Sequence, residues 1–84
     1  MRLPVIKHLV EGPFDEDFFD EALMVLERLI DAPTIKDEEL DVIGELMSNL
    51  EGAKAVMTDI RVNKVPEKEA LNAFMKRVLG SIDK

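Results

Sequence analysis

The segment Asp37–Asn63, DEELDVIGELMSNLEGAKAVMTDIRVN, decides the fold of this chain. Its apolar residues recur at spacings of three and four, which is the pattern of a helix with one buried face. They are Leu40, Ile43, Leu46, Met47, Leu50, Ala53, Val56, Met57 and Ile60. Thr34 is the expected N-cap, and Asp37, Glu38 and Glu39 put negative charge in the first turn, where the helix dipole favours it. We expect one long central helix on which the rest of the chain packs.

Two cations interrupt this apolar stripe. At about 100° per residue, Lys54 and Arg61 fall near the angular position of Ile43 and Met47. The pattern leaves two alternatives open. Either the buried face drifts along the helix, or the helix bends near Gly52.

A row of small residues, Gly44, Ser48 and Gly52, follows the same helix at four-residue spacing. A glycine inside a helix costs about 1 kcal/mol relative to alanine, so a row of this kind indicates that another backbone comes close. One interpretation is close packing within the monomer. The other is a seam for self-association.

Three further helices flank the central one. Leu3–Val10 has Pro4 in its first turn, where the missing N–H costs nothing. Phe14–Asp31 has Asp15 as the expected N-cap, with Phe14 stapled against Phe19. Its expected buried residues are Phe18, Ala22, Leu26, Leu29 and Ile30.

The last expected helix starts at Pro66. Its apolar stripe consists of Ala70, Leu71, Phe74, Met75, Val78, Leu79 and Ile82. The connections between the helices are short, as in a bundle of antiparallel neighbours. The sequence therefore predicts one all-α domain over residues 1–84, a small four-helix bundle with three main helices and a short N-terminal one.

The composition argues against most kinds of chemistry. The 84 residues include no cysteine and one histidine, which leaves no thiolate for metal binding or redox exchange. His8 has only Glu11 as a nearby carboxylate by sequence, and we interpret it as a boundary residue of its helix. Without metal, nucleophile or phosphate-loop motifs, we expect no enzyme, no cofactor and no metal site. No apolar run approaches 18 residues, so we expect no membrane span and a cytoplasmic protein.

The charge is divided unevenly along the chain. Residues 1–53 hold fourteen acidic and four basic residues, a formal charge of −10, whereas residues 54–84 carry +3. The acidic cluster Asp15, Glu16, Asp17 and Asp20 either solvates a helix start or attracts a basic partner. A further alternative is that the acidic residues of 1–53 pair with the basic residues of 54–84 within the chain. The overall charge of −7 argues against nucleic-acid binding.

Three segments together resemble a family of short bacterial proteins catalogued as a domain of unknown function. They are LPVIK at residues 3–7, KDEELDVIGEL at residues 36–46, and KEALNAFMKRVLGSID at residues 68–83. The resemblance implies a cytoplasmic bacterial protein with no known activity. It also makes a thioredoxin- or peroxiredoxin-type protein a conceivable partner.

The leading hypothesis is a non-catalytic protein–protein interaction module that self-associates or binds another protein. Its candidate contacts are Gly44, Ser48 and Gly52 for a seam, and Asp15, Glu16, Asp17 and Asp20 for an acidic patch. The alternative is a carrier that holds an apolar small molecule in its core. Its support is the five methionines, whose flexible side chains make a core adaptable.

Overall fold

A computed structural model describes the backbone of residues 2–82 and the side chains of residues 2–78. In that part of the chain there are four helices and no strand: α1 (Leu3–Val10), α2 (Glu16–Ile30), α3 (Asp37–Asn63) and α4 (Glu67–Ile82). The prediction of an all-α four-helix bundle with a long central helix is confirmed. Leu79 and Ile82, expected in the apolar stripe of α4, have side chains outside the described set.

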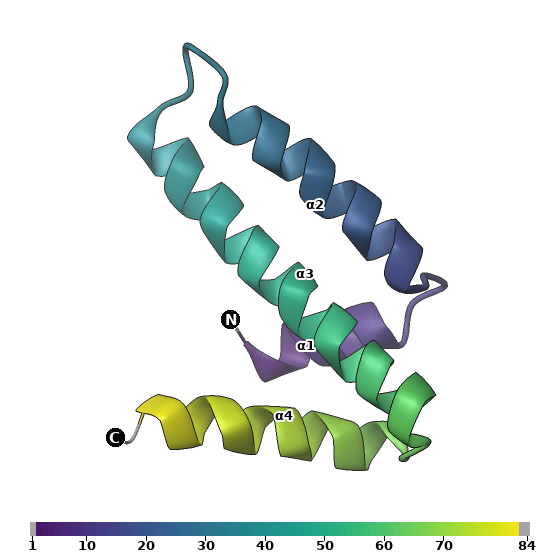
Figure 1. The fold of residues 1–84 in the computed structure, drawn as a ribbon. Helices are drawn as coiled ribbons and strands as arrows, with labels where there is room; N and C mark the ends of the chain where they lie inside the picture. The colour runs from purple at the N-terminus through teal and green to yellow at the C-terminus, as the bar shows by residue number, and fades with distance from the viewer. Residues whose placement is uncertain (1, 83–84) are drawn as a thin grey trace.

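Helix α3 is the element that every other helix contacts. It runs beside α2 as an antiparallel hairpin, and α1 and α4 lie at the end of the hairpin away from the α2–α3 loop (Figure 1). Between Arg2 and Ile82, α2 and α4 make no contact with each other. The bundle is consequently open, with one half built from four helices and the other half from two.

The core lies in the half where all four helices meet. Its buried residues are Ile6 from α1, Phe19 from α2, Ala53 and Val56 from α3, and Ala70, Leu71 and Phe74 from α4. In the other half of the hairpin, Ile43 is the one buried side chain among residues 20–48. The distribution of burial therefore follows the arrangement of the helices.

The start of α1 is fixed by a buried polar residue of α3. Asn49 accepts a hydrogen bond from the backbone N–H of Arg2 at 3.0 Å and donates one to the carbonyl of Glu45 at 3.1 Å. Because a buried amide without partners would be costly, these two bonds set where α1 begins along α3.

The glycine row serves close packing within the chain at one of its members. A Cβ added at Gly52 would lie 2.9 Å from Ile6 Cδ1 and 3.1 Å from Phe74 Cζ. Gly52 is buried and is therefore not available to a seam, so the sequence hypothesis is corrected at this position. A Cβ at Gly44 would have no heavy atom of its surroundings within 4 Å. Gly44 is exposed and Ser48 is half-buried.

The N-terminus of α3 is capped differently from the prediction. Thr34 lies in the preceding turn, and the N-cap is Lys36, whose backbone N–H donates to Glu39 Oε1 at 3.0 Å. This contact is the reciprocal half of a capping box, in which the N3 carboxylate satisfies the N-cap amide. The expectation for α2 is confirmed, because the Asp15 carboxylate accepts from the Phe18 N–H at 3.2 Å.

The predicted buried face of α2 was wrong for three of its residues. Phe18, Leu29 and Ile30 are exposed, and Phe19 is the buried aromatic residue of the helix. The predicted contact between Phe14 and Phe19 is confirmed, with ring centroids 6.1 Å apart in an edge-to-face arrangement. The apolar arc of α2 is wider than one helix can cover, and among the residues that the structure describes α3 is the one helix that contacts α2. About half of that arc is therefore left in solvent.

Candidate functional site

The cations of α3 face acidic residues of α2. Arg61 Nε donates to Glu16 Oε1 at 2.6 Å and its guanidinium donates to Oε2 at 3.1 Å, while Thr58 Oγ1 donates to Oε2 at 2.8 Å. One turn further along, Lys54 pairs with Asp20. Helix α3 continues through Gly52 as a single helix. Along α3, the side chains that contact α2 change from apolar residues to the cations Lys54 and Arg61. The two cations in the apolar stripe are therefore partners of acidic residues on α2.

These pairs account for much of the predicted acidic patch. Asp15 caps α2, Glu16 binds Arg61 and Thr58, and Asp20 binds Lys54, whereas Asp17 is exposed. Hydrogen bonds from Arg61 and Thr58 lower the pKa of Glu16 below its ordinary value of 4.5. A carboxylate with a lowered pKa is a weak general base, so its contact with the Thr58 hydroxyl does not prepare a nucleophile.

Substituting Glu16 with glutamine is expected to lower the melting temperature by a few degrees at pH 7. The folded-state pKa of Glu16 is depressed, so its stabilising contribution is present above the unfolded-state pKa and is lost as pH falls through the folded-state value. Thermal melts of wild type and E16Q should therefore converge in acid. Glu21→Gln, at an exposed position of α2, is the matched control and should leave the melting temperature nearly unchanged.

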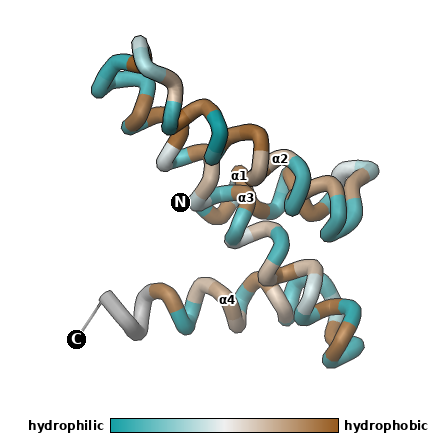
Figure 2. The backbone as a smooth tube through the Cα atoms, turned by 45° about the horizontal axis from the view of Figure 1, so that its top comes forward, coloured by the Kyte–Doolittle hydropathy of each residue, from teal (hydrophilic) through white to brown (hydrophobic). Residues whose placement is uncertain are grey.

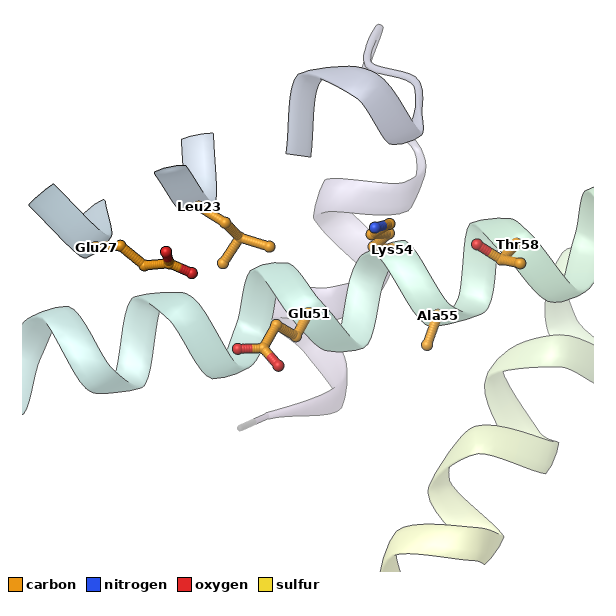
Figure 3. A pocket seen from close by; sticks show the side chains of 6 residues that line it. All are labelled: Leu23, Glu27, Glu51, Lys54, Ala55 and Thr58. Atoms are coloured by element: carbon orange, nitrogen blue, oxygen red, sulfur yellow. The ribbon is translucent and has the colours of Figure 1, made fainter. Parts of the chain in front are cut away.

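A groove of about 590 Å³ lies between α2 and α3. Figure 3 shows Leu23 and Glu27 lining it from α2, and Glu51, Lys54, Ala55 and Thr58 from α3. Glu27 and Glu51 are exposed, and the Lys54 amine is engaged by Asp20. The groove brings together charged side chains that already have solvent or a partner.

A second hollow of about 410 Å³ lies between α1 and α4 and contains a carboxyl pair. A hydrogen bond with Glu11 raises the pKa of Glu67, burial raises it further, and Lys7 opposes this effect. His8, for which Glu11 is the nearest carboxylate by sequence, is exposed. Glu11 thus has a carboxyl partner on α4, Glu67. The sequence did not predict this pair, because the two residues come together only through the packing of α1 and α4.

Glu67→Gln is expected to raise the melting temperature by a few degrees at pH 7. A carboxyl group whose pKa is higher in the folded protein than in the unfolded chain binds its proton more tightly when folded, so stability falls as pH rises through the folded-state pKa. The gain should disappear in acid, below the ordinary value of 4.5, where Glu67 keeps its proton in the folded protein. Melts of both proteins from pH 4 to pH 8 measure this, and a gain that is independent of pH would contradict it.

Several large apolar side chains of the α2–α3 hairpin are exposed. Phe18, Val25 and Leu29 on α2, with Val42 and Leu46 on α3, are exposed by 45–63 %, and we name these five residues the apolar face. Leu29 and Val42 line one hollow of about 390 Å³, together with Ile35 and Ile43, so the two helices contribute to a common surface. Figure 2 shows hydrophobic residues continuing along the hairpin away from α4.

The sequence interpretation missed the apolar face, although a signal for it exists. On α2, Phe18, Ala22, Val25 and Leu29 follow a 4-3-4 spacing. On α3 the stripe Val42, Leu46, Asn49, Ala53, Val56 and Ile60 has the same alternation. Such heptad spacing on both helices of a hairpin is typical of helices that pack against further helices. Along α3, its part from Asn49 onward is buried or half-buried, and Val42 and Leu46 are exposed.

The described residues form neither a metal-binding cluster nor a membrane-spanning helix. No group of three or more histidine, aspartate or glutamate side chains within residues 2–78 is arranged to hold a metal ion. None of the four helices, as far as the chain is described, combines the length and the apolarity that a bilayer crossing needs.

Comparison with known proteins places the chain in a family. A family model described as "Family of unknown function (DUF6952)" matches residues 1–83. No curated protein and no solved structure matches the chain. The match spans nearly the whole sequence, in agreement with the resemblance seen in its first, middle and last segments. The chain belongs to this family of unknown function, DUF6952.

Proposed function

We propose that this chain is a non-catalytic protein–protein interaction module of the bacterial cytoplasm, and that the apolar face is its contact surface. The observation that supports the proposal is the exposure of Phe18, Val25, Leu29, Val42 and Leu46 on one hairpin. Large apolar patches on soluble proteins are typical of sites that bind another protein. The charged groove between α2 and α3 has no comparable apolar character, because Glu27, Glu51 and Lys54 line it.

The acidic residues have a secondary role in this proposal. Glu16 and Asp20 are engaged by α3, so the contact surface is defined by apolar side chains and only framed by charge. A thioredoxin- or peroxiredoxin-type protein, suggested by the family resemblance, is one partner class to include. Such a partner would bind by surface contact, because the chain has no thiol to exchange.

The test is affinity purification of the tagged full chain from a bacterial host that carries its gene, with Val42→Lys and Val62→Lys run in parallel. The two valines lie on α3 and are 57 % and 58 % exposed, but Val62 lies outside the apolar face. A protein retained by wild type and V62K and lost by V42K supports the proposal. Native mass spectrometry of the same samples adds a contrary outcome, since a retained apolar small molecule without protein would favour the carrier alternative.

A further inference from the structure

We propose that the partner of the apolar face is a second copy of this chain, so that two α2–α3 hairpins pack into an intermolecular four-helix bundle. This inference rests on the proposed contact role of the apolar face and names its occupant. It is carried by the shape of the molecule, by its exposed area and by the heptad spacing of both helices.

The shape of the chain is that of an open slab. Its principal extents are 43 × 33 × 18 Å and its radius of gyration is 14.0 Å, whereas a compact domain of this length has a radius of gyration of about 12 Å. The slab is 18 Å thick, and Ile43 is the one buried side chain among residues 20–48 of the hairpin. The residues of the hairpin half consequently have no second layer to pack against.

The exposed area exceeds that of a compact monomer by the size of an interface. The chain exposes 6184 Å², and a compact monomer of 9.5 kDa exposes about 5,000 Å². The excess is on the order of 1,100 Å², and a stable complex of standard size buries about 800 Å² on each partner. This excess is comparable to one partner's share of a dimer interface.

The spacing and position of the apolar face fit another hairpin of the same kind. Phe18, Val25 and Leu29 follow the heptad rows of α2, and Val42 and Leu46 extend on α3 the stripe that is buried from Asn49 onward. In a dimer with a two-fold axis, the apolar face of one copy packs against the apolar face of the other, so both faces are buried at once. Two antiparallel helix pairs joined in this way form a four-helix bundle with its own core.

The interface would lie opposite the remaining small residues of α3. Gly44 is two positions after Val42, and at 100° per residue the two residues point about 160° apart around the helix when counted the short way. An interface through Gly44 and Ser48 and one through Val42 and Leu46 are therefore different structures. One substitution on each of these two sides of α3 therefore distinguishes the two interfaces.

The experiment is sedimentation equilibrium of the full chain from about 1 to 500 µM, with V42K on the apolar face, and with V62K and Gly44→Leu as variants outside it. Wild type, V62K and G44L are expected to reach twice the 9.5 kDa mass of the chain. V42K is expected to have a dissociation constant at least about tenfold higher, because it places a charge in an apolar contact. Circular dichroism should show unchanged helicity in V42K, since the side chain it replaces is exposed.

Salt dependence gives a second readout. Each copy carries a net charge of −7, so added salt should screen the repulsion between copies and strengthen the dimer. A wild type that stays monomeric at 500 µM would overturn the inference, and so would dissociation by G44L in place of V42K. A monomer that still retains a foreign protein through Val42 would overturn the second copy as partner and leave the proposed function standing.

Discussion

Replacing Ile6 with alanine is expected to lower the free energy of unfolding by about 2–5 kcal/mol. Ile6 has no exposed surface and packs against Gly52 and Phe74, so the substitution leaves a cavity where α1, α3 and α4 meet. A domain of this length has a total stability of about 4–13 kcal/mol. At the lower end of that range the loss removes half of the stability or more, and part of the I6A population should then be unfolded at 37 °C.

Urea denaturation followed by circular dichroism at 222 nm measures this effect, at one fixed protein concentration so that self-association contributes equally. Val62→Ala is the control, because its side chain is 58 % exposed at the last turn of α3. The control should change the free energy of unfolding by no more than about 0.5 kcal/mol. Equal stability of I6A and wild type would mean that α1 is not part of the folded core.

Gly52→Val is expected to destabilise the protein by about 1–3 kcal/mol, and Gly44→Val is expected to stabilise it by a few tenths. The two glycines lie in one helix, so the same substitution isolates the effect of the surroundings. At Gly52 the added atoms meet Ile6 and Phe74 within 3.1 Å, whereas at Gly44 they enter open space. Denaturation of both variants measures the difference, and similar values would contradict the close approach of α1 and α4 to Gly52.

The helices themselves could be predicted from the sequence because their signals are local. The start of α2 follows from Asp15, whose carboxylate caps it, and α1 follows from Pro4 in its first turn. The cap of α3 was missed because Lys36 acts through its backbone N–H, which any residue could supply. Glu39 was the available signal, since its carboxylate completes the box three residues later.

The buried side of α2 could not be predicted in the same way. The apolar residues of α2 cover an arc wide enough for two neighbours, and periodicity alone does not tell which part of the arc a neighbour covers. The sequence assigned Phe18 and Leu29 to the interior, whereas the fold buries Phe19. The pairing of Glu16 with Arg61 was likewise hidden, because it joins residues 45 positions apart.

The candidate site was predicted only in part. The close approach expected along the row of small residues is found at Gly52, where the approaching side chains are Ile6 and Phe74 of the same chain, and not at Gly44, where a Cβ would enter open space. The apolar face was not anticipated, because Val42 and Leu46 continue a stripe whose other members are covered by α1 and α4. Asn49 binds the start of α1 and so fixes the position along α3 at which this cover begins. The length of α1 decides how far along α3 the cover extends.

The contact of α3 with all three other helices has a consequence for how the sequence can diverge. Within the described chain, α2 and α4 share no contact, so substitutions in one should combine additively with substitutions in the other. Changes in α3 have no such independence where the helix packs, because α1, α2 and α4 each contact it. Inherited variation should therefore accumulate separately in α2 and α4, while α3 changes only together with whichever helix it touches.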